Sequence, residues 1–196
     1  MNEPVVDRRV RKTKKILREC LTQLLKSKKI QDITVRELTE MADFNRGTFY
    51  LHYKDVFDLL EQMEDELLIS FSQLLNQLDA TNRGVPPRQV LAEIFSMARE
   101  NADLAEILLG ENGDLNFLNR LKALIREKCL RDWMALVRGG SGADFEACCA
   151  FISSGSVGLV HHWLQTGMAQ SPQELAVLAE RIILHGMSAL KEGEYR

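Results

Sequence analysis

Residues 33–60 read ITVRELTEMADFNRGTFYLHYKDVFDLL, and the order of residue types in this stretch decides the fold. Thr34 is followed three residues later by Glu37, which is the spacing of a capping box. In that motif each side chain accepts a hydrogen bond from a free backbone N–H group of the other residue. We therefore expect a short helix that begins after Thr34 and ends at about Ala42.

A second short helix follows after a turn that ends at Asn45, a preferred N-cap residue. This helix should begin at Arg46 and end at about His52. Phe49 and Tyr53 stand four residues apart and direct one face toward a core. The side chains left facing outward are Arg46, Thr48, Tyr50 and His52. Two short helices joined by such a turn are typical of the helix-turn-helix unit, whose second helix enters the DNA major groove.

A longer, basic helix should precede this unit, from about Asp7 to Lys26. Residues 8–54 hold 13 Lys or Arg against 5 Asp or Glu, although the whole chain carries a net charge of −3. Seven cations lie in the first half of the helix: Arg8, Arg9, Arg11, Lys12, Lys14, Lys15 and Arg18. Positive charge at this end of a helix is unfavourable because of the helix macrodipole, unless an external anion is bound there. This asymmetry favours a polyanion bound at one end; the alternative is a solvated charged face.

The remaining chain predicts further helices. Asp55 should cap a long helix that runs to about Leu78, and the first clear loop follows it. Later helices are expected at 87–100, 102–109, 115–137, 144–166 and 172–191. We therefore predict an all-α fold with two domains. A three-helix helix-turn-helix DNA-binding domain at residues 1–60 is joined by the long helix to a larger helical ligand-binding and dimerisation domain at 61–196.

Several function classes find no support in the sequence. It contains no glycine-rich phosphate loop, HExxH motif or nucleophile elbow, so we expect neither an enzyme nor a cofactor. No apolar stretch approaches the roughly 18–20 residues of a membrane helix, and the first residues lack a secretory signal, so we expect a cytoplasmic protein. We interpret Cys20, Cys129, Cys148 and Cys149 as reduced thiols and predict no metal site. The alternative is a site shared across a dimer, formed by Cys148, Cys149, His161, His162 and His185.

From about Val10 to Leu60 the chain resembles the signature of the TetR/AcrR family of transcriptional regulators in order, spacing and residue types. The resemblance implies phosphate contacts from Thr34 and Arg36. It implies base-reading positions at Arg46, Gly47 and Thr48, with Tyr50 and His52 on phosphates. Lys54 presents a further donor to the backbone. Where the family often has a second Lys, two residues later, this chain has Val56, so Lys54 or the basic first helix would replace that contact.

The resemblance also implies a homodimer in which the last two helices of each subunit pair into a four-helix bundle. The sequence supports this independently, because small residues recur at helical spacing in 144–166 and permit close helix approach: Ala147, Ser154, Gly155 and Gly158. Packing within one subunit is the alternative explanation. A dimer also suits DNA, because half-sites on one face of the duplex lie about 34–36 Å apart.

The larger domain should enclose an effector pocket lined by apolar side chains that could equally fill a core: Met97, Phe117, Trp133, Phe151 and Trp163. We therefore expect a repressor that a small apolar or amphipathic effector releases from a palindromic double-stranded operator. The alternative is an activator, or an interaction module, that acts through a partner protein rather than by occluding the operator.

Overall fold

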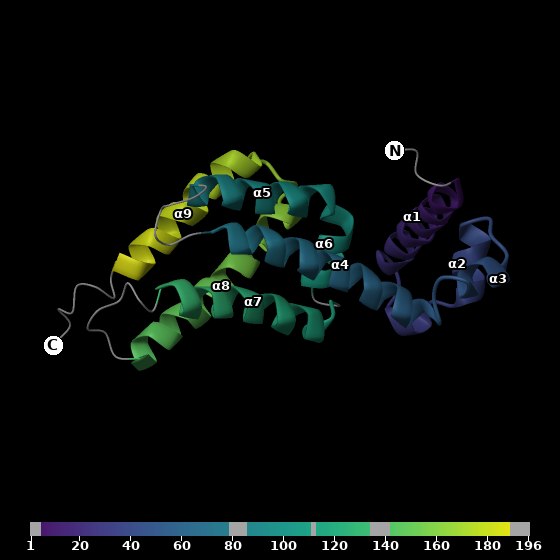
Figure 1. Ribbon diagram of the computed structural model, residues 1–196, viewed down its shortest axis with the longest axis horizontal. Coiled ribbons are helices and arrows are strands. Elements are labelled where there is room, and N and C mark those ends of the chain that lie inside the picture. The colour runs from purple at the N-terminus through teal and green to yellow at the C-terminus, as the bar shows by residue number, and fades with distance from the viewer. Residues whose placement is uncertain (1–4, 79–85, 111–112, 134–141, 189–196) are drawn as a thin grey trace. The chain divides into compact units, whose positions relative to one another are not determined.

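The computed structural model describes residues 5–78, 86–110, 113–133 and 142–188, and within them every regular element is a helix (Figure 1). The all-α prediction is confirmed. The chain divides into two compact units, Met1–Leu67 and Leu68–Arg196. Among the described residues, no helix combines the length and the apolarity that crossing a bilayer requires.

The first unit is built from four helices and one 3₁₀ turn around a small core. The elements are α1 (Val5–Leu25), η1 (Ile30–Asp32), α2 (Val35–Met41), α3 (Arg46–Tyr50) and the first part of α4 (Val56–Gln77). Their apolar faces meet in side chains that are completely buried: Leu17, Leu21, Leu38, Phe49 and Leu59. Because these residues recur at helical spacing in the sequence, each short helix has one buried and one exposed face.

The turn between α2 and α3 depends on Asp43, whose φ of 54° lies in the left-handed region. The Phe44 N–H then donates to the Thr39 carbonyl at 2.9 Å, which closes α2 in the manner of a Schellman motif. Aspartate tolerates this conformation better than most non-glycine residues do. The turn therefore ends α2 sharply and starts α3 three residues later.

The helix α3 ends at Tyr50, two residues before the predicted end at His52. The Phe49 carbonyl accepts hydrogen bonds from both the His52 and the Tyr53 N–H groups, at 2.9 and 3.0 Å. This tightened turn removes His52 from the helix but keeps it beside α3. The predicted ends of two later helices, at Val137 and Lys191, lie outside the described residues.

The second unit contains the rest of α4 and five further helices. They are α5 (Pro87–Glu100), α6 (Ala102–Leu109), α7 (Leu115–Trp133), α8 (Gly142–Gln165) and α9 (Pro172–Ser188). One apolar cluster joins α4, α5, α7 and α8 around Phe71, Val90 and Cys149. A second cluster joins α5, α8 and α9 around Phe95, Trp163 and Ala176. The helix α5 contributes to both clusters and so links the two parts of this core.

Trp163 is the largest completely buried side chain of the second unit. Its ring meets Phe95 edge-on, with ring centroids 5.9 Å apart. The indole N–H donates to the Gln170 carbonyl at 2.9 Å, in the connection between α8 and α9. Trp163 therefore supplies both apolar packing and the bond that holds this connection.

Replacing Trp163 with Phe should lower the free energy of unfolding by about 2 kcal/mol, because it removes one hydrogen bond and leaves unfilled volume beside Phe95. Urea denaturation of the variant and of the wild-type protein measures the difference. An unchanged midpoint and slope would show that the indole is not a structural anchor.

Candidate nucleic-acid interface

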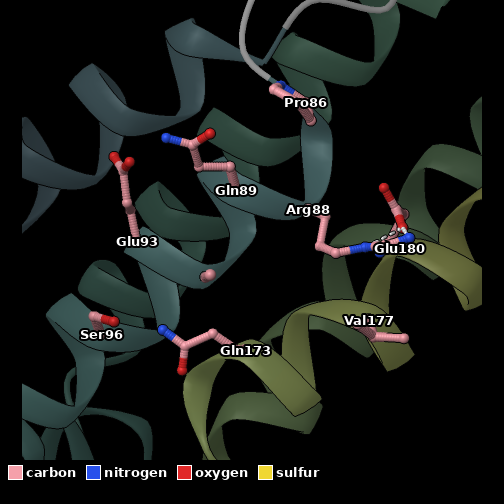
Figure 2. Close-up of a pocket in the computed structure, with 9 residues that line it drawn as sticks. Pro86, Arg88, Gln89, Glu93, Ser96, Gln173, Val177 and Glu180 are labelled. Carbon is pink, nitrogen blue, oxygen red and sulfur yellow. Dashed lines mark hydrogen bonds and ion pairs between the residues drawn. The ribbon is translucent and has the colours of Figure 1, made fainter.

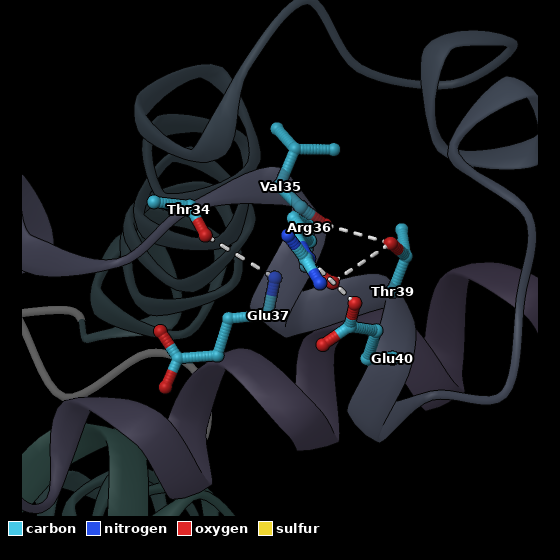
Figure 3. A network of polar contacts seen from close by, with 6 residues as sticks. All are labelled: Thr34, Val35, Arg36, Glu37, Thr39 and Glu40. Atoms are coloured by element: carbon cyan, nitrogen blue, oxygen red, sulfur yellow. Dashed lines mark hydrogen bonds and ion pairs between the residues drawn. The ribbon is translucent and has the colours of Figure 1, made fainter.

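Thr34 caps the start of α2 as the sequence predicts, but the return bond of a capping box, from the Thr34 N–H to the Glu37 carboxylate, is not formed. The Glu37 N–H donates to Thr34 Oγ1 at 3.2 Å (Figure 3). The Glu37 carboxylate accepts a hydrogen bond from Lys28 Nζ, so it ties α2 to the segment after α1. The Thr39 hydroxyl donates to the carbonyls of Val35 and Arg36, at 2.8 and 3.1 Å. Thr34 is left exposed at the first turn, where free N–H groups and the helix dipole favour an anion.

Arg36 is exposed one turn into the same helix and pairs with Glu40, with 2.7 Å between Nε and Oε1. This hydrogen bond raises the pKa of the Arg36 guanidinium. Ion pairs at such exposed positions are weak, so a phosphate could replace Glu40 at little cost. Arg36 therefore remains available to an external anion.

The helix α3 is fixed by its cap and by a single buried ring. The Gly47 N–H donates to Asn45 Oδ1 at 2.8 Å, so the predicted N-cap is confirmed. Phe49 is completely buried, whereas Arg46, Gly47 and Tyr50 are exposed. A Cβ placed on Gly47 would meet only Asn45 Oδ1, at an ordinary 3.5 Å. Packing within the chain therefore does not require glycine at this position.

The side chains beside these exposed residues are partly covered. Thr48 and His52 are half-buried, and Lys54 is exposed. The Arg46 guanidinium makes no hydrogen bond or ion pair within the part of the chain that the structure describes. Arg46 thus differs from Arg36, because its charge has no internal partner.

The basic helix α1 has two kinds of cation. Arg18 donates hydrogen bonds to both carboxylate oxygens of Glu66 on α4, with 2.6 Å between Nη1 and Oε2. These bonds raise the pKa of the Arg18 guanidinium and fix the packing of α1 on α4. Lys14 lies over the Tyr53 ring, 5.7 Å from its centroid. Arg18 therefore belongs to the fold, whereas the exposed cations nearer the start of α1 are Arg8, Arg9, Arg11 and Lys12.

The start of α4 is held by two aspartates. The Asp58 N–H donates to Asp55 Oδ1, and the Lys54 N–H donates to Asp58 Oδ2, both at 2.8 Å. Asp55 therefore caps the start of α4, as predicted. Val56 is only 5% exposed, so the apolar residue at the family's second lysine position is part of the core. The burial of Val56 explains why this position offers no phosphate contact.

Of the five side chains predicted to line an effector pocket, the four that the structure describes lie in different surroundings. Trp163 fills the second cluster, and Met97 packs at the edge of the first. Phe117 is buried, but Phe151 is 72% exposed and faces away from any core. The side chain of Trp133 lies outside the described residues.

A groove of about 700 Å³ instead lies between α5 and α9 (Figure 2). Arg88 and Glu180 stand at one end, and Ser96 and Gln173 at the other. None of the five predicted pocket residues lines it. The sequence holds no signal for this groove, because it depends on how two helices far apart in the chain pack together.

No other kind of site is evident in the described residues. No group of three or more His, Cys, Asp or Glu side chains there could hold a metal ion. None of the four cysteines, all of which the structure describes, forms a disulfide, and burial raises the pKa of the Cys20, Cys148 and Cys149 thiols. A raised pKa keeps a thiol protonated and poorly reactive.

Comparison with known proteins identifies relatives of both the sequence and the fold. The TetR_C_8 family model, described as a transcriptional regulator C-terminal region, matches residues 87–185. A curated relative, the uncharacterized HTH-type transcriptional regulator YxbF of Bacillus subtilis (strain 168), is 29% identical over 97 residues. The match covers 47% of this chain and 25% of the relative, so the chain spans about a quarter of that protein's length.

Solved structures share the fold over nearly the whole chain. A TetR transcriptional regulator from Streptococcus agalactiae 2603V is 24% identical, with a TM-score of 0.63 over 91% of this chain and 97% of its own. NalD, the secondary repressor of the MexAB-OprM multidrug efflux pump in Pseudomonas aeruginosa, is 16% identical, with a TM-score of 0.67 over 90% and 96%. A SmeT–triclosan complex is 18% identical, with a TM-score of 0.65 over 94% of each chain.

The carboxylate at the start of α4 predicts a pH dependence. Hydrogen bonds from the Lys54 N–H and then from Gln62 lower the pKa of Asp58. Because the folded-state pKa lies below the unfolded one, the stabilisation is present above the unfolded pKa of about 4 and is lost as pH falls through the folded pKa. Asp58→Asn should therefore flatten the fall in unfolding free energy between about pH 5 and pH 2, measured by urea denaturation.

Glu61→Gln provides the control for this test, because Glu61 is an exposed carboxylate on the same helix. Its pH profile should follow that of the wild-type protein. Equal slopes for Asp58→Asn and the wild-type protein would refute the role of Asp58 at the start of α4.

Proposed function

The chain belongs to the TetR/AcrR family of transcriptional regulators, and we propose that it is a homodimeric repressor that a small apolar or amphipathic effector releases from a palindromic operator. The observation that carries this proposal is the exposed face of α3, where the Arg46 guanidinium makes no hydrogen bond or ion pair with the described residues. A helix of this kind fits the DNA major groove, which is about 12 Å wide and distinguishes all four base pairs. In this proposal residues 1–60 bind DNA, and residues 61–196 bind the effector and the second subunit.

Arg46, Gly47 and Thr48 are the proposed base-reading residues. Arg46 can donate two hydrogen bonds to O6 and N7 of a guanine, the commonest specific contact in the major groove. Gly47 allows the start of α3 to approach the duplex closely, which agrees with its exposure and with the space around it. Thr48 can donate to a base or touch a thymine methyl group. Together these residues would set the sequence preference of each half-site.

The proposed phosphate contacts surround the base-reading residues. Thr34 and Arg36 lie at the start of α2, while Tyr50, His52 and Lys54 lie at and after the end of α3. Phosphate contacts fix the register of a protein on DNA and add affinity without sequence preference. Lys54, together with the exposed cations of α1, would replace the contact that the buried Val56 cannot make.

Dimerisation is proposed through one face of α8 and α9. The helix α8 exposes Ala147, Phe151, Ser154, Gly155 and Gly158 at helical spacing. A Cβ placed on Gly155 or Gly158 would meet nothing within 4 Å, so these glycines are not explained by packing within the chain. The helix α9 adds exposed Leu178 and Ile182. Apolar and small residues on one exposed face are typical of a surface that another helix covers.

The effector is proposed to act through α4, which begins in the first unit and continues into the second. Met97, Phe117, Trp133, Phe151 and Trp163 remain candidates for contact with it, and a cavity among them would require rearrangement of the packed residues. The SmeT structure that shares this fold is a complex with triclosan, which supports a small-molecule ligand. An effector that prefers a form unable to bind the operator must itself bind less tightly when DNA is present.

The second candidate function is an activator, or an interaction module, that acts through a partner protein. It is favoured by exposed apolar side chains on the first unit, of which Leu51 is 80% exposed and Phe57 54%. Such side chains can serve a protein contact as well as a DNA contact. In vitro transcription from the bound promoter separates the two functions, because a repressor lowers the yield of transcript and an activator raises it.

Arg46→Ala should weaken operator binding by about 1–3 kcal/mol and relax the preference at one base pair in each half-site. Tyr50→Ala should weaken binding to all sequences about equally, because a phosphate contact carries no sequence information. Fluorescence anisotropy with the operator and with single-base variants measures both effects. Arg99→Ala is the matched control, since Arg99 is an exposed arginine on α5. Wild-type affinity for both the Arg46 and the Tyr50 variants would contradict the assignment of α3.

Gly155→Leu tests the dimer. Because a Cβ at this position has no described neighbour within 4 Å, the variant should keep the helical content of the wild-type protein. It should nevertheless obstruct a second helix and raise the dimer dissociation constant by about tenfold or more, the effect of a 1.4 kcal/mol loss. Sedimentation equilibrium measures the change, with Ala123→Leu as a control at an exposed position of α7, outside the proposed dimer face. An unchanged dimer would place the interface elsewhere.

A further inference from the structure

The groove between α5 and α9 has the size of a small-molecule site. Its volume of about 700 Å³ falls within the range of roughly 300–1,000 Å³ that ligand pockets occupy. Ala92 on α5 and Val177 on α9 give it an apolar floor. Ala92 packs against the cluster of Phe95, Trp163 and Ala176, to which both α5 and α9 contribute, so the two walls belong to one packed core. A ligand here would meet a preformed surface.

One end of the groove is closed by an ion pair. Arg88 donates from Nε and from Nη2 to Glu180 Oε2, at 2.9 and 2.8 Å (Figure 2). The Glu180 side chain is only 13% exposed, whereas that of Arg88 is 58% exposed. The guanidinium is thus directed onto the carboxylate and covers it. Arg88 is the only cation among the residues that line this groove.

The second carboxylate of the groove, Glu93, has no such partner. Its side chain makes no hydrogen bond or ion pair in the described part of the chain, and the same holds for the side chains of Gln89, Ser96 and Gln173. The lining therefore carries two carboxylates against one guanidinium, and that guanidinium is already paired. A ligand that carries a positive charge would therefore complement the charge of the lining.

We propose that this groove binds a small organic cation: an ammonium group that pairs with Glu93, carried on a short apolar body that lies on Ala92 and Val177. The amides of Gln89 and Gln173 and the Ser96 hydroxyl accept the remaining ammonium hydrogens or bind a polar end group. An anionic ligand is disfavoured, because its charge would face the unpaired carboxylate of Glu93.

The groove lies on a different side of α9 from the proposed dimer face. At 100° per residue, Gln173, Val177 and Glu180 share one side of the helix. Leu178 and Ile182 fall more than a quarter turn away from that side. A partner subunit that covers Leu178 and Ile182 would leave the groove open. The site is therefore compatible with the dimer and does not depend on it.

Three probes with the same six-carbon chain test the charge preference: hexylamine, hexanol and hexanoate. Each is titrated into the full-length protein with labelled alanine and valine methyl groups, and the methyl NMR signals of Ala92 and Val177 are followed. Hexylamine should shift both signals with a saturable dependence on concentration. Hexanol should bind about twofold to fivefold more weakly, the range expected for loss of one partly exposed ion pair, and hexanoate more weakly still.

Two substitutions with opposite expected effects test the residues. Glu93→Gln should weaken hexylamine to the affinity of hexanol. Arg88→Gln should tighten hexylamine, because it uncovers the second carboxylate at Glu180. Glu100→Gln, an exposed carboxylate at the end of α5, is the matched control and should leave all three affinities unchanged. Thermal unfolding of each variant without ligand separates a folding defect from a binding effect.

Equal affinities for hexylamine and hexanol, or a hexylamine affinity that Glu93→Gln does not change, would overturn the proposal. So would the absence of saturable shifts at Ala92 and Val177 in the millimolar range. Because these measurements contain no DNA, they stand apart from the proposed repressor function. Loss of operator binding in another variant would leave this result untouched, and an empty groove would leave the operator assignment untouched.

Discussion

Burial of the Phe49 ring is the interaction on which the orientation of α3 depends. The ring meets Tyr50 edge-on and Tyr53 at a tilt, with ring centroids 5.6 Å apart in both pairs. A helix of five residues cannot hold its own orientation through backbone hydrogen bonds, because nucleation costs more than so few bonds return. The Asn45 cap fixes where α3 begins, and Phe49 fixes how it is rotated. Arg46, Gly47 and Tyr50 face solvent as a consequence.

Charge in the first unit is divided between stability and binding. Arg18 pairs with Glu66, 48 residues away, and Lys28 pairs with Glu37, which joins the segment after α1 to α2. Arg46 has no internal partner, which costs the fold little because its charge stays in water. A duplex would supply the missing anion and favour association by long-range attraction. The second unit supplies the acidic balance of the chain and, in the groove between α5 and α9, an uncompensated carboxylate.

Features that depend on neighbours in the sequence could be predicted. The caps at Thr34, Asn45 and Asp55 follow from local hydrogen bonding and are all present. The small-residue face of α8 followed from spacing, and its exposure agrees with the dimer prediction. The end of α3 at Tyr50 could not be predicted from the sequence. It depends on a turn set by tertiary packing, in which the Phe49 carbonyl accepts hydrogen bonds from two N–H groups.

Features that depend on contacts between distant segments escaped prediction. Periodicity marks Trp163 and Phe151 as equally apolar, yet one fills a core and the other is exposed. Whether Trp163 or Phe151 is buried depends on how α5 and α9 pack against α8. This packing is determined by residues of three helices and cannot be inferred from the pattern of α8 alone. The groove is a product of the same packing. The pairing of Arg18 with Glu66, 48 residues apart, likewise removes a cation that the sequence assigns to DNA.

The proposed dimer reads two half-sites through α3. The arrangement of half-sites in the bound DNA, and the number of chains on it, test this most directly. Duplexes can be selected from sheared genomic DNA by gel shift, and their contacts mapped by footprinting at several salt concentrations. We expect two chains on each duplex and an inverted repeat with half-sites about 34–36 Å apart, or a multiple of that spacing. Affinity should fall linearly on a double-logarithmic salt plot. Equal binding to all fragments, or full affinity for a single half-site, would contradict the account.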